Sequence, residues 1–192
     1  HEDGSAVYAT DAHTEAPIPF VKAPEKVNHV RFRRPFLERR TEELRASTEA
    51  IAEAASAAAA EDQGASAVSR ILAAADSAKM LLVGHSFGAT SMVRYLADAE
   101  TASRYCGAVL LDVWPEALPQ TDLQKELLVP FAQLVSEFWS IEYREDCRKI
   151  ATCSGGRCHM VVGVRGSKHQ WISEVNYFMP PWLLRRVGMA GP

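Results

Sequence analysis

The pentapeptide GHSFG at residues 84–88 constrains the fold of this chain more than any other feature of its sequence. It fits the pattern G-x-S-x-G, which here follows an apolar run at 80–83 and precedes a helical pattern that includes Met92, Val93 and Leu96. A serine at such a strand-to-helix turn stands clear of the backbone, and flanking glycines carry no Cβ to clash where strand and helix approach. The helix dipole favours negative charge that develops at its N-terminus. The context therefore predicts that Ser86 is a nucleophile.

Further apolar runs alternate with helical stretches after the motif. The pattern predicts four strands that end in a loop or turn, at 80–83, 107–111, 131–135 and 160–164. We expect the first of them to be buried on both faces, and a helix to lie around 122–128. Alternation of this kind is typical of a parallel sheet covered by helices. The fold class is therefore α/β, and the serine motif indicates an α/β-hydrolase sheet.

The base that a serine nucleophile needs is expected late in the chain, because α/β-hydrolases order the three residues as serine, acid and histidine. Only His159 and His169 follow Asp112. His159 precedes the last strand, whereas His169 follows it, at the carboxyl end where such sheets place their sites. We therefore predict His169 as the base and regard His85 and His29 as structural.

The acid has three candidates. Asp112 ends the strand after the serine motif, and Glu137 ends the next one, where many α/β-hydrolases carry their acid. Asp146 lies in a polar, helix-like stretch and ranks third. Chain order alone leaves Asp112 and Glu137 nearly equal.

The composition of the sequence divides the chain into three segments. Residues 1–36 are predicted to be irregular because prolines and loop signals recur there, and 37–78 are predicted to be an Ala-rich helical insertion. In the insertion Leu37, Leu44 and Ile51 form a narrow apolar stripe, while Ser66 is expected to cap a second helix with Val68, Ile71 and Leu72 on one face. Residues 79–192 carry the serine motif.

Composition excludes several classes of function. The formal net charge is −3, so nothing indicates a nucleic-acid partner, and no run reaches the roughly 18 apolar residues that a membrane span requires. The spacing of Cys147, Cys153, Cys158 and His159 is not that of a structural zinc site, and we expect free thiols unless Cys153 and Cys158 pair. A basic-aromatic run suits either a solvated face or contact with phospholipid headgroups; it comprises Arg31, Phe32, Arg33, Arg34, Phe36, Arg39 and Arg40.

Three stretches resemble the plasma and intracellular type II platelet-activating-factor acetylhydrolases: GHSFGA at 84–89, CGAVLLDVW at 106–114 and VRGSKHQ at 164–170. These enzymes are calcium-independent serine phospholipases that remove short or oxidised acyl chains. The resemblance implies Ser86 as nucleophile, His169 as base and Asp112, in its L-D-x-W context, as acid. It also implies a phospholipid substrate, peripheral contact with a membrane or lipoprotein, and no metal or organic cofactor.

The same resemblance implies that this chain begins midway through the family's catalytic domain, since HEDGSA at 1–6 is similar to a stretch that ends an earlier strand there. We then expect the C-terminal half of an α/β-hydrolase domain, with the backbone N–H of Phe87 as the remaining oxyanion-hole donor. The compartment, cytoplasmic or secreted, stays open. The alternative functions are a general carboxylesterase or lipase, and a non-catalytic hydrolase fragment that lacks a complete oxyanion hole.

Overall fold

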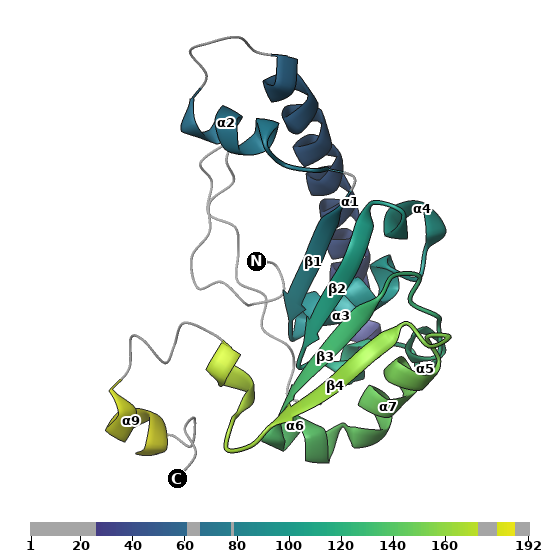
Figure 1. Ribbon diagram of the computed structural model, residues 1–192. Helices are drawn as coiled ribbons and strands as arrows, with labels where there is room; N and C mark the ends of the chain where they lie inside the picture. Colours follow the sequence, from purple (N-terminus) through teal and green to yellow (C-terminus); the bar gives the residue numbers. More distant parts are fainter. Residues whose placement is uncertain (1–25, 61–65, 78, 173–179, 187–192) are drawn as a thin grey trace.

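A four-stranded, all-parallel sheet forms the centre of the molecule (Figure 1). The computed structural model describes residues 26–60, 66–77, 79–172 and 180–186. The strands lie side by side in chain order, as β1 (Met80–His85), β2 (Tyr105–Leu111), β3 (Phe131–Ser136) and β4 (Cys158–Val164). The four predicted strands and their parallel arrangement are confirmed, and the fold is α/β.

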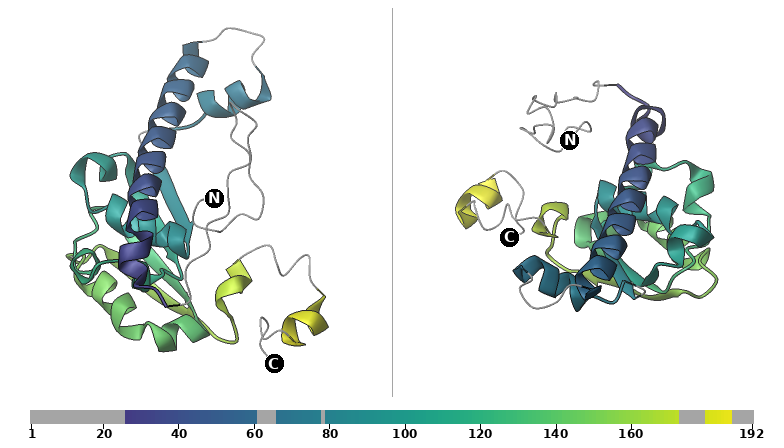
Figure 2. Two further views of the ribbon diagram at one scale, coloured as in Figure 1. Left: turned by 180° about the vertical axis from the view of Figure 1, so that it is seen from behind. Right: turned by 90° about the horizontal axis from the view of Figure 1, so that it is seen from above.

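Helices join successive strands and pack on one face of the sheet (Figure 1). α3 (Phe87–Tyr95) packs on β1 and β2, and α7 (Arg144–Thr152) packs beside β4. The long helix α1 (His29–Ala60) packs against α3, and it lies in front of the sheet in the left view of Figure 2, which is seen from behind. The shorter elements are α2 (Ala67–Ala73), α4 (Ala99–Ala102), η1 (Pro115–Ala117), α5 (Gln120–Leu123), α6 (Glu137–Glu142), η2 (His169–Ile172) and α9 (Pro181–Arg186).

The hydrophobic core lies between the sheet and these helices. Leu110 of β2 is fully buried against Met92, Val93 and Leu96 from α3 and the segment that follows it. Leu37 attaches α1 to the same core with no exposed surface. Burying each such side chain contributes roughly 1.5–3 kcal/mol, so the core fixes α1 and α3 against the sheet.

α1 begins earlier than the sequence pattern indicated. It starts at His29, so the prediction of irregular chain up to residue 36 is wrong for 29–36, while 1–25 lie outside the described residues. Pro35 lies inside this helix and lacks the N–H for one helical hydrogen bond. Burial of Leu37 two residues later, with the ring of Phe32 tilted against that of Phe36, holds the helix through that position.

The second predicted helix and the heptad stripe are confirmed only in part. Ser66 caps α2 by accepting a hydrogen bond from Ser69 N at 3.1 Å, but Val68 and Ile71 are exposed. Along the predicted apolar stripe of α1, Leu37 is buried but Ile51 is exposed. The predicted helix near 122–128 is shorter and earlier, as α5.

One face of the sheet carries exposed apolar side chains, contrary to the expectation that β1 is buried on both faces. Leu81 and Val83 of β1 are more than half exposed. The register across the sheet puts Val83, Val109 and Ala132 in one row with Met160 of β4, which is also exposed. The apolar composition of β1 predicted a strand correctly, but burial on both faces is wrong, because Leu81 and Val83 are exposed.

Within the part of the chain that the structure describes, no helix combines the length and the apolar character that crossing a bilayer demands.

Candidate active site

The turn between β1 and α3 holds Ser86 in a backbone conformation that few residues adopt. Its φ of 56° and ψ of −122° lie outside the common regions. The backbone N–H of Ser86 donates to Leu111 O at 2.9 Å, which ties the turn to the end of β2. Such strain persists only where surrounding structure enforces it, and it concentrates at functional sites. The predicted sharp turn is therefore present.

The two glycines of the motif have different roles. A Cβ on Gly84 would lie 2.4 Å from Met92 Sδ and 3.0 Å from Ala89 N, so a side chain there would require Met92 and the backbone of α3 to shift. A Cβ on Gly88 would have no neighbour within 4 Å. The expectation that both glycines prevent a clash is right for Gly84 and wrong for Gly88.

Substitution by alanine should separate these two glycines. We expect Gly84→Ala to lower the free energy of unfolding by about 1–3 kcal/mol, because backbone atoms of α3 must shift. Gly88→Ala should be neutral or stabilising by up to about 1 kcal/mol, since alanine favours a helix. Urea unfolding curves measure both changes. Equal losses for the two variants would contradict the assignment of close approach to Gly84.

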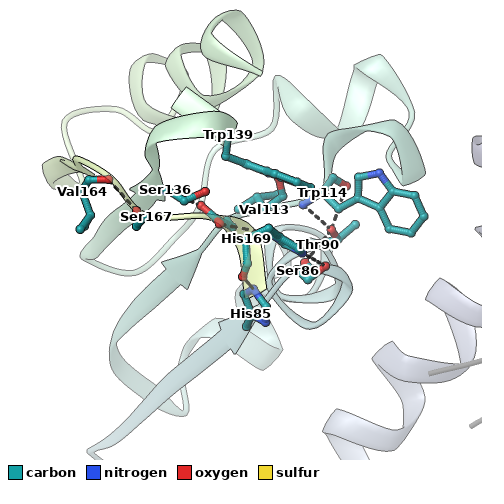
Figure 3. A network of polar contacts seen from close by, with 11 residues as sticks. His85, Ser86, Thr90, Val113, Trp114, Ser136, Trp139, Val164, Ser167 and His169 are labelled. Atoms are coloured by element: carbon teal, nitrogen blue, oxygen red, sulfur yellow. Dashed lines mark hydrogen bonds and ion pairs between the residues drawn. The ribbon is translucent and has the colours of Figure 1, made fainter. Parts of the chain in front are cut away.

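His169 meets Ser86 directly. The histidine follows β4 in η2, and its Nε2 lies 2.8 Å from Ser86 Oγ (Figure 3). The other ring nitrogen, Nδ1, lies 3.2 Å from Asp112 Oδ2. A carboxylate only accepts hydrogen bonds, so Nδ1 carries the proton and Nε2 of the neutral ring accepts from the Ser86 hydroxyl. This is the protonation that a general base needs.

Asp112 lies at the end of β2 and is almost fully buried. Its Oδ1 accepts a hydrogen bond from Ser136 N at 2.6 Å, while Oδ2 faces His169. Its φ of 44° is positive, and among the described residues Ser86 is the only other non-glycine residue with a positive φ. Both strained residues thus belong to one hydrogen-bonded group.

The other candidates for acid and base lie away from Ser86. Glu137 Oε2 accepts from Gly166 N at 2.7 Å, so this carboxylate fastens the loop that precedes His169. Asp146 pairs with Lys149 on α7, and His159 is exposed at the start of β4. The structure therefore brings Asp112, and not Glu137 or Asp146, to the histidine.

A model of one protein family, described as platelet-activating factor acetylhydrolase, isoform II, matches residues 1–192. The chain belongs to this family. It is a family of phospholipid acyl-ester hydrolases, as the resemblance of the three stretches predicted. No curated protein matches the chain significantly.

His85, which precedes Ser86 in this acetylhydrolase-family chain, supports the backbone of His169. Its Nε2 donates to His169 O at 3.0 Å, and the two rings lie 4.5 Å apart. Burial, and then the charge of His169, lower the pKa of His85 below its usual value of 6.5. His85 is therefore neutral at pH 7, in agreement with the structural role predicted for it.

Thr90 braces the loop after Asp112, and no motif in the sequence singled it out. Thr90 Oγ1 of α3 accepts from Trp114 N at 3.1 Å and lies 3.0 Å from Ser86 O and 2.9 Å from Trp114 O. It connects the serine turn to the loop after β2. In the sequence it is only a threonine one turn into the expected helix, and a threonine in that position is too common to be identified as a functional residue.

Several arginines of the basic run on α1 pair with glutamates of the same helix or lie over aromatic rings. Arg34 pairs with Glu38, and both Arg39 and Arg40 lie near Glu43. Arg33 lies over the rings of Phe32, Phe36, Phe87 and Trp114, with its Cζ 5.2–6.0 Å from their centroids. All four cysteines are free, so Cys153 and Cys158 do not pair.

Within the described ranges, one group of side chains has the composition of a metal site: His85, Asp112 and His169, whose ligand atoms lie within 4.8 Å of one another. Both oxygens of Asp112 and both ring nitrogens of His169 already face protein partners. The arrangement fits movement of a proton from Ser86 better than retention of a cation.

Proposed function

We propose that this chain is a serine esterase that cleaves the sn-2 short or oxidised acyl ester of phospholipids resembling platelet-activating factor. The observation that carries the proposal is the continuous hydrogen-bonded path from Ser86 Oγ through the His169 ring to Asp112. Membership of a phospholipid acyl-ester hydrolase family supports the substrate class.

The roles follow from the positions of the protons. His169 Nε2 accepts the Ser86 proton as Oγ attacks the ester carbonyl, and the imidazolium then protonates the leaving lyso-phospholipid oxygen. Asp112 holds the ring in the required tautomer and stabilises its positive charge. Water, activated by the same histidine, hydrolyses the acyl-serine and releases the short fatty acid. No metal or organic cofactor takes part in these steps.

The negative charge on the tetrahedral intermediate needs hydrogen-bond donors. Phe87 is the first residue of α3, so its backbone N–H has no acceptor within the helix. We propose this N–H as an oxyanion-hole donor, assisted by the helix dipole. Each such donor is worth about a hundredfold or more in rate.

A comparison of three substrates tests the proposal. We expect kcat/KM on a 2-acetyl phosphocholine to exceed that on the same lipid with a long sn-2 chain by at least about tenfold. An aryl acetate reports esterase chemistry without headgroup recognition. Hydrolysis of the aryl ester without any preference for the acetylated phospholipid would favour a general carboxylesterase. Absence of fluorophosphonate labelling at Ser86 would favour a non-catalytic protein.

A further inference from the structure

Trp139 makes the closest ring contact of the site. It lies in α6, two residues beyond the first residue of that helix, and its indole stacks on the His169 ring with centroids 3.9 Å apart and an interplanar angle of 10°. Figure 3 shows the indole on one side of His169 and His85 on the other. Two aromatic rings therefore bracket the predicted base.

The indole is itself held in place. Trp139 Nε1 donates to Val113 O at 2.7 Å, which attaches it to the residue after Asp112. Its ring also lies 4.8 Å from that of Tyr143, on the opposite end of α6. A half-buried indole whose N–H has a fixed acceptor has little freedom to turn. The stack therefore ties His169 to the segment that carries its acid.

The hydrogen bonds of His169 do not fix its ring fully. Contacts at Nδ1 and Nε2 hold two corners of the imidazole, but they leave it free to tilt about the line between those corners. A flat ring against one face removes that tilt. Small errors in the placement of a catalytic group are costly, because proton transfer requires short, aligned contacts.

The stack also matters for charge. When His169 takes the Ser86 proton it becomes a cation, and the face of an indole attracts cations. His85, on the other side, is uncharged at pH 7 because burial and the charge of His169 lower its pKa, so it does not repel the imidazolium. The indole therefore attracts an imidazolium from one side of the ring, and uncharged His85 does not repel it from the other.

We propose that Trp139 is a positioning residue for His169, which fixes the plane of the imidazole and stabilises the imidazolium formed during acylation. The inference rests on the proposed function, since it assigns His169 as the base. Ordinary packing of α6 is the competing explanation for the same contact. The two differ in which kinetic constant responds to loss of the indole face.

The test compares Trp139→Leu, Trp139→Phe and wild type, with active sites titrated by a fluorophosphonate. We expect Trp139→Leu to lower kcat per active site by about tenfold to a hundredfold, with KM changed less than about threefold. Trp139→Phe keeps a ring face and should stay within about fivefold of wild type. Phe138→Leu, at the exposed neighbouring position, is the matched control and should change neither constant.

A second readout does not depend on turnover. In Ser86→Ala protein with labelled histidine, the indole ring current should displace the His169 ring-proton resonances, and Trp139→Leu should abolish that displacement. Trp139→Met replaces Trp139→Leu if the latter does not fold. An unchanged kcat, or a Trp139→Phe variant as impaired as Trp139→Leu, would overturn the proposal.

Failure of the proposed function gives a different result. If Ser86 is labelled and aryl esters are hydrolysed while phospholipids are not, the substrate assignment is wrong, and the same variants still test Trp139 on the aryl ester. If wild-type Ser86 is not labelled at all, the pair of Ser86 and His169 does not operate and the inference about Trp139 is overturned with it.

Discussion

Ser86→Ala is expected to reduce esterase activity about a million-fold, to the background rate of the assay. The substitution removes the hydroxyl that we propose as the nucleophile, while the alanine side chain fits the space of the serine. The core around α3 is untouched, so thermal unfolding should be unchanged. Initial rates on the acetylated phospholipid, with labelling by a fluorophosphonate, measure the effect.

Ser103→Ala is the matched control for this variant, because Ser103 Oγ only donates to Glu100 O at the end of a surface helix. It should retain wild-type activity and labelling. Residual activity in Ser86→Ala above about one per cent of wild type, or labelling at another serine, would show that the nucleophile lies elsewhere.

Asp112→Asn is expected to lower kcat by about ten-thousandfold. The amide is nearly isosteric with the carboxylate, but its N–H₂ group donates to Nδ1 of His169 and so selects the tautomer that cannot accept the Ser86 proton. Substrate binding does not use Asp112, so KM should change little. Steady-state kinetics at pH 7 measure both constants.

Glu137→Gln is the companion variant, because it removes the charge of the acid that competed with Asp112 in the sequence. Its amide oxygen can still accept from Gly166 N, which Glu137 Oε2 now does at 2.7 Å. We expect activity within about threefold of wild type. A large loss in Glu137→Gln together with a small one in Asp112→Asn would reverse the assignment of the acid.

Local patterns were enough to predict the sheet. Four apolar runs separated by helical stretches fix strands that must be parallel, because each crossover is long enough to return the chain to the same end. The carboxyl ends of parallel strands share one edge, so Ser86 and His169 were expected to meet there, and they lie in hydrogen-bond contact. Family resemblance carried the choice of Asp112, which chain order had left open against Glu137.

Errors arose where a local signal was opposed by packing. Pro35 and its neighbours indicated loop, yet burial of Leu37 and contacts of its aromatic neighbours extend α1 back to His29. The apolar composition of β1 indicated burial on both faces, yet Leu81 and Val83 are exposed in the part of the chain described. An apolar composition shows that a strand can be buried on both faces. Whether a face is covered depends on how the other elements of the fold are arranged.

By itself, the sequence determined the sharp turn at Ser86, the α/β class and the end of the sheet at which the site forms, because these follow from chain-local spacing. The tertiary structure decided the partners of His169. Asp112 and Glu137 both follow strands, but the positive φ of Asp112 turns its carboxylate towards the histidine, whereas Glu137 faces Gly166. Trp139 meets His169 only because α6 and η2 converge on the same edge of the sheet, and that proximity has no counterpart in residue spacing.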